Sequence, residues 1–217
     1  MADEPDNTIS TCWNDVLVDY QVAKAAAEAV SNKPACRVRE QIFETFAETV
    51  RTIQHTSAPD LTAIVEKLQV YWRAGDLADG SYGNDFRRKI IGDLRRIERQ
   101  RAGVAEPHAS GGMDIRQVEH RWAETLRDYD HYSRLLAEGP PGKKTWSGKT
   151  ATETTVKRDE AEAMLLSLPA PNLAAVIQKL DILWENDDWF GPIADTSLHA
   201  ALMGELQRFA LDENDRP

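Results

Sequence analysis

The sequence predicts an all-α protein built as a tandem duplication of a roughly four-helix unit, with about eight helices in total. Apolar residues recur at helical spacing along most of the chain, and no segment shows sustained alternation with β-branched enrichment. Matching phrases also occur twice in the same order. The 217 residues suffice for one sizeable core or for two small domains.

The duplication is clearest in one phrase. APDLTAIVEKL at 58–68 returns as APNLAAVIQKL at 170–180, an offset of 112 residues. The same offset carries IIGDLRRI at 90–97 onto LMGELQRF at 202–209. Because such agreement in order and spacing is improbable by chance, we interpret the chain as two copies of one unit.

A third pair of phrases lies upstream in each repeat. WNDVLVDY at 13–20 matches WAETLRDY at 122–129, here with an offset of 109. The difference of three residues indicates a net insertion in the second repeat. The turn-forming sequence GPPGKK at 139–144 is the natural place for it.

Each repeat contains four apolar stripes at helical spacing. The first stripe is Trp13, Val16, Leu17 and Tyr20, echoed by Trp122, Leu126 and Tyr129. The second is Ile42, Phe43, Phe46, Val50 and Ile53, with a weaker partner in Val156, Met164, Leu165 and Leu168. The third is Leu61, Ile64, Val65, Leu68 and Trp72, repeated as Leu173, Val176, Ile177, Leu180 and Trp184. The fourth is Phe86, Ile90, Leu94 and Ile97, matched by Leu198, Leu202, Leu206 and Phe209.

Helix starts and a linker divide these stripes. Asp60 and Asn172 follow a proline and precede the first apolar residue of the third stripe, which is the position of an N-cap. The Gly- and Pro-bearing stretch at 102–114 is typical of a linker. The expected organisation is a tail (1–12), a first repeat (13–101), the linker (102–114), a second repeat (115–211) and a second tail (212–217). Whether the repeats share one core is left open.

The repeated phrase Ala-Pro-x-Leu-x-Ala-x-x-x-Lys-Leu resembles a motif that recurs in uncharacterised helical proteins of alphaproteobacteria. Those proteins are often encoded near prophage or other mobile-element genes. The resemblance covers about a tenth of the chain and implies no assigned chemistry, so it transfers no functional residue.

Composition excludes several classes of protein. The formal charge of −10 opposes general attraction to nucleic acid or anionic lipid. No stretch reaches the length of about 18 apolar residues that a membrane span needs, and the acidic start does not resemble a secretory signal. Cys12 and Cys36 are interpreted as reduced thiols rather than a disulfide. The expected location is the cytoplasm.

Acidic residues recur on the first helix of both repeats. Asp15 and Asp19 correspond to Glu124 and Asp128. Paired carboxylates can perform acid–base work or bind a metal, but a structural role is favoured here. We expect Asp19 to pair with Lys67, and Asp128 to pair with Lys179.

No catalytic motif is present. The sequence lacks GxSxG, HExxH, a P-loop and GxGxxG. Asp128 and His131 have the carboxylate–histidine spacing of di-iron bundles, but the first repeat has Val22 in place of His131. We therefore expect no catalytic residue, no metal site and no cofactor.

A basic helix at 86–101 differs most between the repeats. Arg88, Arg95 and Arg99 fall within about 40° of one another at ~100° per residue, opposite the apolar stripe. The second repeat has Ala200, Gln207 and Leu211 at the equivalent positions. A solvated face and a partner-binding surface are both compatible with this pattern.

Three aromatic residues lie in polar loops. Trp146 stands in GKKTWSGKT, and Trp189 and Phe190 stand in NDDWFGP. Aromatic side chains of this kind occur at interfaces, although they also fold back over cores.

These features favour a non-enzymatic interaction or regulatory module that binds an acidic protein surface. One alternative is a nucleic-acid-associated protein that uses the basic helix. Another is a small-molecule-binding or enzymatic bundle with a cleft between the repeats. The sequence leaves the oligomeric state open.

Overall fold

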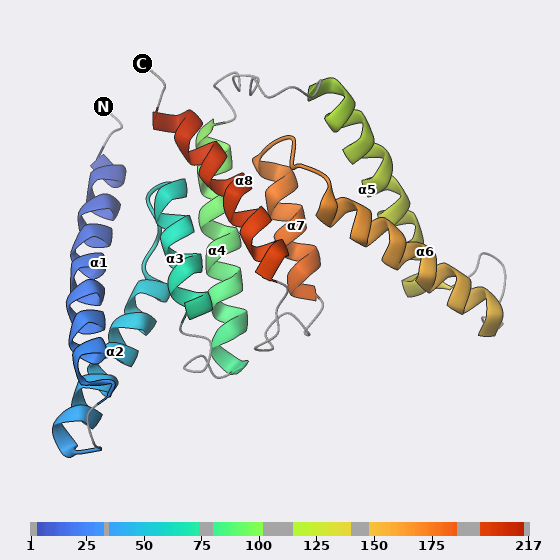
Figure 1. Ribbon diagram of the computed structural model, residues 1–217. Coiled ribbons are helices and arrows are strands. Elements are labelled where there is room, and N and C mark those ends of the chain that lie inside the picture. The colour runs from blue at the N-terminus through green and yellow to red at the C-terminus, as the bar shows by residue number, and fades with distance from the viewer. Residues whose placement is uncertain are drawn as a thin grey trace. The chain divides into compact units, whose positions relative to one another are not determined.

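The computed structural model describes residues 4–32, 35–73, 80–101, 115–139, 148–185 and 196–214. Within these ranges the regular structure is entirely helical, which confirms the predicted all-α class (Figure 1). The described residues form eight helices: α1 (Glu4–Val30), α2 (Arg37–His55), α3 (Leu61–Arg73), α4 (Gly80–Arg101), α5 (Ile115–Glu138), α6 (Gly148–Ser167), α7 (Leu173–Glu185) and α8 (Thr196–Asn214).

The chain separates into two compact units. Unit 1 comprises residues 1–104 with the segments 188–194 and 206–217, and unit 2 comprises residues 105–187 and 195–205. Each unit contains a long helical hairpin, formed by α1 and α2 in unit 1 and by α5 and α6 in unit 2 (Figure 1). These two hairpins make the most extensive helix–helix contacts among the described residues.

The predicted stripes of α3 and α4 form the core of unit 1. Leu61, Ile64 and Leu68 are fully buried on α3, and Ile90 and Leu94 are fully buried on α4. Packing of these two helices is consolidated by aromatic stacking. The rings of Tyr71 and Phe86 are 4.1 Å apart, centroid to centroid, and burial raises the pKa of Tyr71 to about 12.

The same class of side chains fills the core of unit 2. Leu173, Val176 and Leu180 of α7 are buried, and Leu165 of α6 is fully buried. Trp13 and Trp122, which start the first stripe of each repeat, are also buried. Tyr20 and Trp184 are buried as well, whereas Tyr129 is only partly buried.

Helix α1 extends beyond its predicted stripe, and the predicted buried face of α6 was wrong in part. Helix α1 begins at Glu4, so part of the expected tail is helical. Helix α6 buries Thr154, Ala161 and Leu165, whereas Val156 and Met164 of its expected stripe are about half exposed. A threonine can occupy this buried position because its hydroxyl donates to the backbone carbonyl of Thr150 at 2.9 Å.

The two motif helices begin where the sequence indicates. Asp60 Oδ1 accepts a hydrogen bond from the Ala63 amide at 2.8 Å, and Asn172 Oδ1 accepts one from the Ala175 amide at 2.9 Å. Each cap satisfies a backbone donor that has no partner within the first helical turn. The predicted N-caps are confirmed.

Removal of the Asp60 cap should destabilise the protein. Asp60→Ala is expected to lower the free energy of unfolding by about 1 kcal/mol, because the Ala63 amide loses its acceptor. Asp60→Asn, which introduces the cap residue of α7, should cost much less. Chemical denaturation of the three proteins measures the difference, and equal losses in both variants would contradict the capping role.

Candidate functional site

A buried lysine organises the centre of unit 1. Lys67 has no exposed surface, and its ammonium lies 3.1 Å from Asp93 Oδ2. Nζ also donates to the backbone carbonyl of Thr56 at 2.5 Å and lies 5.9 Å from the ring centroid of Trp13. The same Asp93 oxygen accepts from the Ala58 amide at 3.0 Å. One carboxylate therefore holds both α3 and the segment that precedes it.

Unit 2 contains the same arrangement. Lys179 Nζ lies 2.7 Å from Glu205 Oε1 and donates to the carbonyl of Leu168 at 2.5 Å. The Ala170 amide donates to the same Glu205 oxygen at 2.9 Å. The ring centroid of Trp122 lies 5.7 Å from Nζ, close to the 5.9 Å that separates Trp13 from Lys67 in unit 1. We call each set of contacts a lysine centre.

The predicted partners of these lysines were wrong. Asp19 and Asp128 are exposed, and the lysines pair instead with Asp93 of α4 and Glu205 of α8. A buried ammonium requires a carboxylate that is itself removed from water, and the acids of the first helices face solvent. The sequence does show that Asp93 and Glu205 occupy equivalent positions, because the offset of 112 carries one onto the other within a repeated phrase.

The lysine centre explains the repeated phrase. Its first alanine is buried and gives its amide to the carboxylate, and its leucines and second alanine are buried in the core. The residue after the proline caps the helix. The lysine donates a hydrogen bond to the backbone carbonyl two residues before the first alanine, which is Thr56 in unit 1 and Leu168 in unit 2. The phrase is thus a local structural signature, and its fixed alanines, leucines and lysine all belong to the core or to the lysine centre.

Burial shifts the titration of the unit 1 centre. Desolvation lowers the pKa of Lys67, and the nearby Asp93 carboxylate offsets part of that shift. Lysines with lowered pKa values serve as bases and nucleophiles when substrate reaches them. Lys67 is fully buried and its ammonium is engaged by Thr56 and Asp93, so this geometry favours a structural role.

The structure divides six of the seven basic residues of α4 into two groups. Lys89 donates to Ser57 Oγ at 2.8 Å, Arg96 donates to the Ala58 carbonyl, and Arg101 is buried. These three belong to the fold.

That second group contains the three predicted binding residues. Arg88, Arg95 and Arg99 are all exposed, as the helical periodicity predicts. The Arg88 side chain is 79% exposed and lies 3.3 Å from Asp85, and Arg99 Nε donates to the Arg95 carbonyl at 3.1 Å. We call these three residues the arginine row.

The equivalent residues of the second repeat are exposed and uncharged. Ala200, Gln207 and Leu211 all lie at the surface of α8. The fold therefore tolerates neutral side chains at these positions. The other predicted binding residues, Trp146, Trp189 and Phe190, lie outside the described residues, as does the side chain of Trp72.

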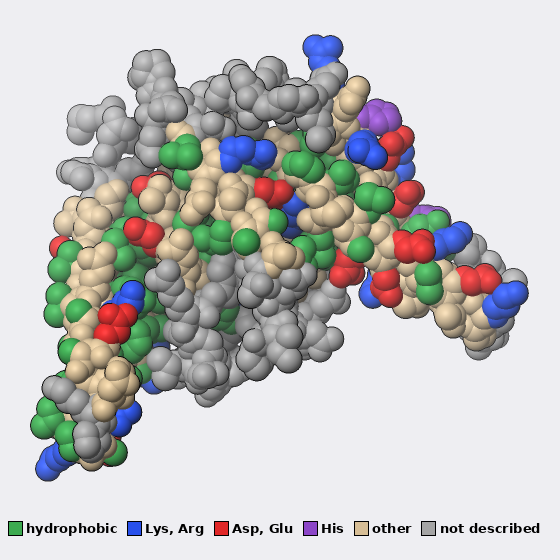
Figure 2. Space-filling model, viewed as in Figure 1, with side chains coloured by type: hydrophobic (Ala, Val, Ile, Leu, Met, Phe, Trp, Pro, Cys, Tyr) green, Lys and Arg blue, Asp and Glu red, His purple; other side chains and the backbone are tan. Residues whose placement is uncertain are grey.

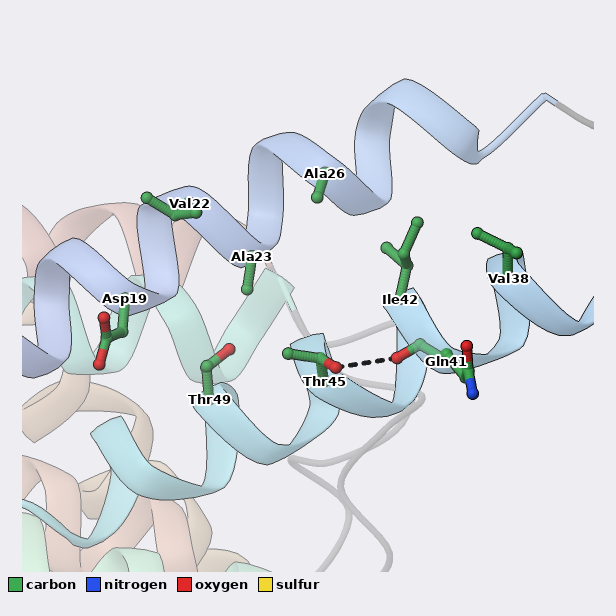
Figure 3. A pocket seen from close by; sticks show the side chains of 9 residues that line it. All are labelled: Asp19, Val22, Ala23, Ala26, Val38, Gln41, Ile42, Thr45 and Thr49. Atoms are coloured by element: carbon green, nitrogen blue, oxygen red, sulfur yellow. Dashed lines mark hydrogen bonds between the residues drawn. The ribbon is translucent and has the colours of Figure 1, made fainter.

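A groove that the sequence analysis missed lies between α1 and α2. It has a volume of about 520 Å³, and Figure 3 shows its walls. Apolar side chains from both helices line most of it, with Asp19 and Thr49 towards one end (Figure 3). The lining residues are Asp19, Val22, Ala23, Ala26, Val38, Gln41, Ile42, Thr45 and Thr49.

The described residues contain no cluster of three or more His, Cys, Asp or Glu side chains arranged to hold a metal ion. No helix among them is long and apolar enough to cross a membrane. Cys12 and Cys36 are exposed and are not joined to each other.

No protein-family model, no curated protein and no solved structure matches this chain.

Removal of the carboxylate of Asp93 alone should destabilise the protein strongly. Asp93→Leu leaves a buried ammonium without its counter-charge, and we expect a loss of about 3–5 kcal/mol in the free energy of unfolding. The double variant Lys67→Met/Asp93→Leu should lose less than the sum of the two single variants. Denaturant titrations of all four proteins measure the coupling, and strict additivity would show that the pair does not act as a unit.

The lysine centre should also make stability depend on alkaline pH. Since the pKa of Lys67 is lowered in the folded state, the unfolded chain binds more protons between that value and the ordinary 10.5. The free energy of unfolding should therefore rise with pH in this window, relative to that of Lys67→Met/Asp93→Leu. Urea titrations of both proteins between neutral pH and pH 10.5 test the sign, and a relative decline would refute it.

Proposed function

We propose that this chain is a non-enzymatic interaction module, built as a tandem duplication of a four-helix unit. The matched lysine centres support the duplication, since the contacts of Lys67 with Asp93, Thr56 and Trp13 recur around Lys179. The matched caps at Asp60 and Asn172 support it independently. The proposal includes the cytoplasmic location inferred from the sequence.

The arginine row is the proposed docking surface, and its partner is a protein with an acidic surface. The observation that carries this proposal is the contrast between α4 and α8. The same helix faces solvent in both repeats, but only α4 carries cations there. Since folding of the repeat does not require these charges, selection for binding is the simpler account of three aligned guanidiniums.

Arginine suits this role because its planar guanidinium can donate two parallel hydrogen bonds to a carboxylate. Three such groups in a row along one helix face present a geometric pattern rather than a diffuse charge. The overall charge of −10 repels acidic surfaces elsewhere, which would favour approach through this face.

The second repeat supplies a matched test. Arg88→Ala, Arg95→Gln and Arg99→Leu together introduce the residues of α8, and the melting temperature should change little because surface substitutions rarely exceed about 0.5 kcal/mol. Affinity capture from the native host, read by quantitative mass spectrometry, should show at least about a tenfold loss of the proteins bound by the wild type.

The control variant removes the same charge from another helix. Arg121→Ala, Arg127→Gln and Arg134→Leu alter three exposed arginines of α5 and should leave capture unchanged. Nuclease treatment of the lysate separates the classes of partner, because a loss of capture after digestion would identify nucleic acid instead. Undiminished capture by the triple variant of α4 would overturn the proposal.

A further inference from the structure

The α1–α2 hairpin exposes apolar surface that its own unit does not cover. Val18, Val22 and Val38 have exposed fractions of 57%, 66% and 63%. They account for three of the six large hydrophobic side chains that are most exposed among the described residues. Figure 2 shows hydrophobic side chains along this hairpin, at the lower left of the view. Val22 and Val38 also line the groove between the two helices.

Beside the groove, α1 carries a row of exposed apolar residues, which we call the apolar row. Val18, Val22, Ala25 and Ala29 are all exposed and follow one another at intervals of four, three and four residues. This is the spacing by which one helix packs along another in bundles and coiled coils. The alanines lie toward the hairpin connection, where their small side chains permit close approach of another helix.

The second repeat shows that the fold does not need this row. The offset of 109 carries Val18, Val22, Ala25 and Ala29 onto Arg127, His131, Arg134 and Glu138, all of which are exposed on α5. The equivalent hairpin of unit 2 therefore has a charged surface at the positions where unit 1 is apolar. The two helices of the hairpin pack against each other in both repeats, with either kind of residue at these positions.

We infer that the α1–α2 hairpin binds the same hairpin of a second molecule of this chain, as an antiparallel four-helix pairing with two-fold symmetry. The chain itself supplies both complementary shapes, because an apolar helical row and an apolar groove lie side by side on one hairpin. A two-fold axis would place the row of each molecule in the groove of the other, which makes the contact self-complementary and closed.

The charge of Arg37 favours the antiparallel direction, although the exposed Glu40 and Glu44 lie within two turns of it on α2. Asp15 and Asp19 are exposed near the base of the hairpin and make no ion pair within the described part of the chain. Arg37 is exposed at the tip, roughly 16 Å from Asp19 along the hairpin at 1.5 Å per residue. An antiparallel pairing brings the acids of each molecule to the arginine of the other. A parallel pairing would instead place the Arg37 side chains of the two molecules near each other.

The test introduces the residues of the second repeat. Wild-type protein should sediment as a dimer at the upper end of a series from about 1 to about 200 µM, with a melting temperature that rises with concentration. Val18→Arg/Val22→His should remain folded, raise the dissociation constant at least about tenfold, and lose the concentration dependence. Val156→Arg, which adds an arginine at an exposed valine of α6, should still dimerise.

A charge exchange tests the direction of pairing. Asp19→Arg and Arg37→Asp should each weaken the dimer, and the two together should restore it. A wild type that is monomeric throughout the series would overturn the inference, as would a dimer that Val18→Arg/Val22→His leaves intact. If the wild type is monomeric and an added amphipathic helical peptide protects Val22 and Val38 in a footprinting experiment, the groove belongs to a different partner.

Discussion

The buried ammonium at the centre of each unit sets the conditions that the surrounding structure must meet. A lysine without exposed surface requires acceptors on several sides, because an unpaired charge in the core costs several kcal/mol. Lys67 obtains them from Asp93 on α4 and from the carbonyl of Thr56 ahead of α3. Trp13 of α1 lies over the same ammonium, so one side chain ties together three parts of unit 1.

This requirement also orders the polypeptide before α3. The Ala58 amide shares the Asp93 oxygen with the lysine, and Arg96 binds the Ala58 carbonyl from the next turn of α4. The backbone at this point is not in a helix, so its polar groups need partners from outside the helical hydrogen-bond pattern. The lysine centre and its neighbours provide those partners, and the N-cap at Asp60 then starts α3.

Comparison of the two repeats separates residues that the fold needs from residues proposed to bind partners. The lysines, the caps and the buried tryptophans are alike in both repeats, and each has contacts or burial that explain it. The arginine row and the apolar row of α1 have exposed, chemically different counterparts in the second repeat. They lie on different helices of unit 1, so contact with an acidic partner and contact with a second molecule could be tested separately.

The sequence by itself determined the helical class, the caps and most of the buried stripes, because each depends on residues within a few turns of one another. Leu61, Ile64 and Leu68 reveal a buried face through their spacing alone. Only the tertiary structure decided which acid meets Lys67, since that choice depends on which of Asp19 and Asp93 is withdrawn from water. The buried face of α6 and the groove beside Val22 and Val38 were decided in the same way. Periodicity locates an apolar side chain on a helix, but neighbouring helices determine whether it is covered.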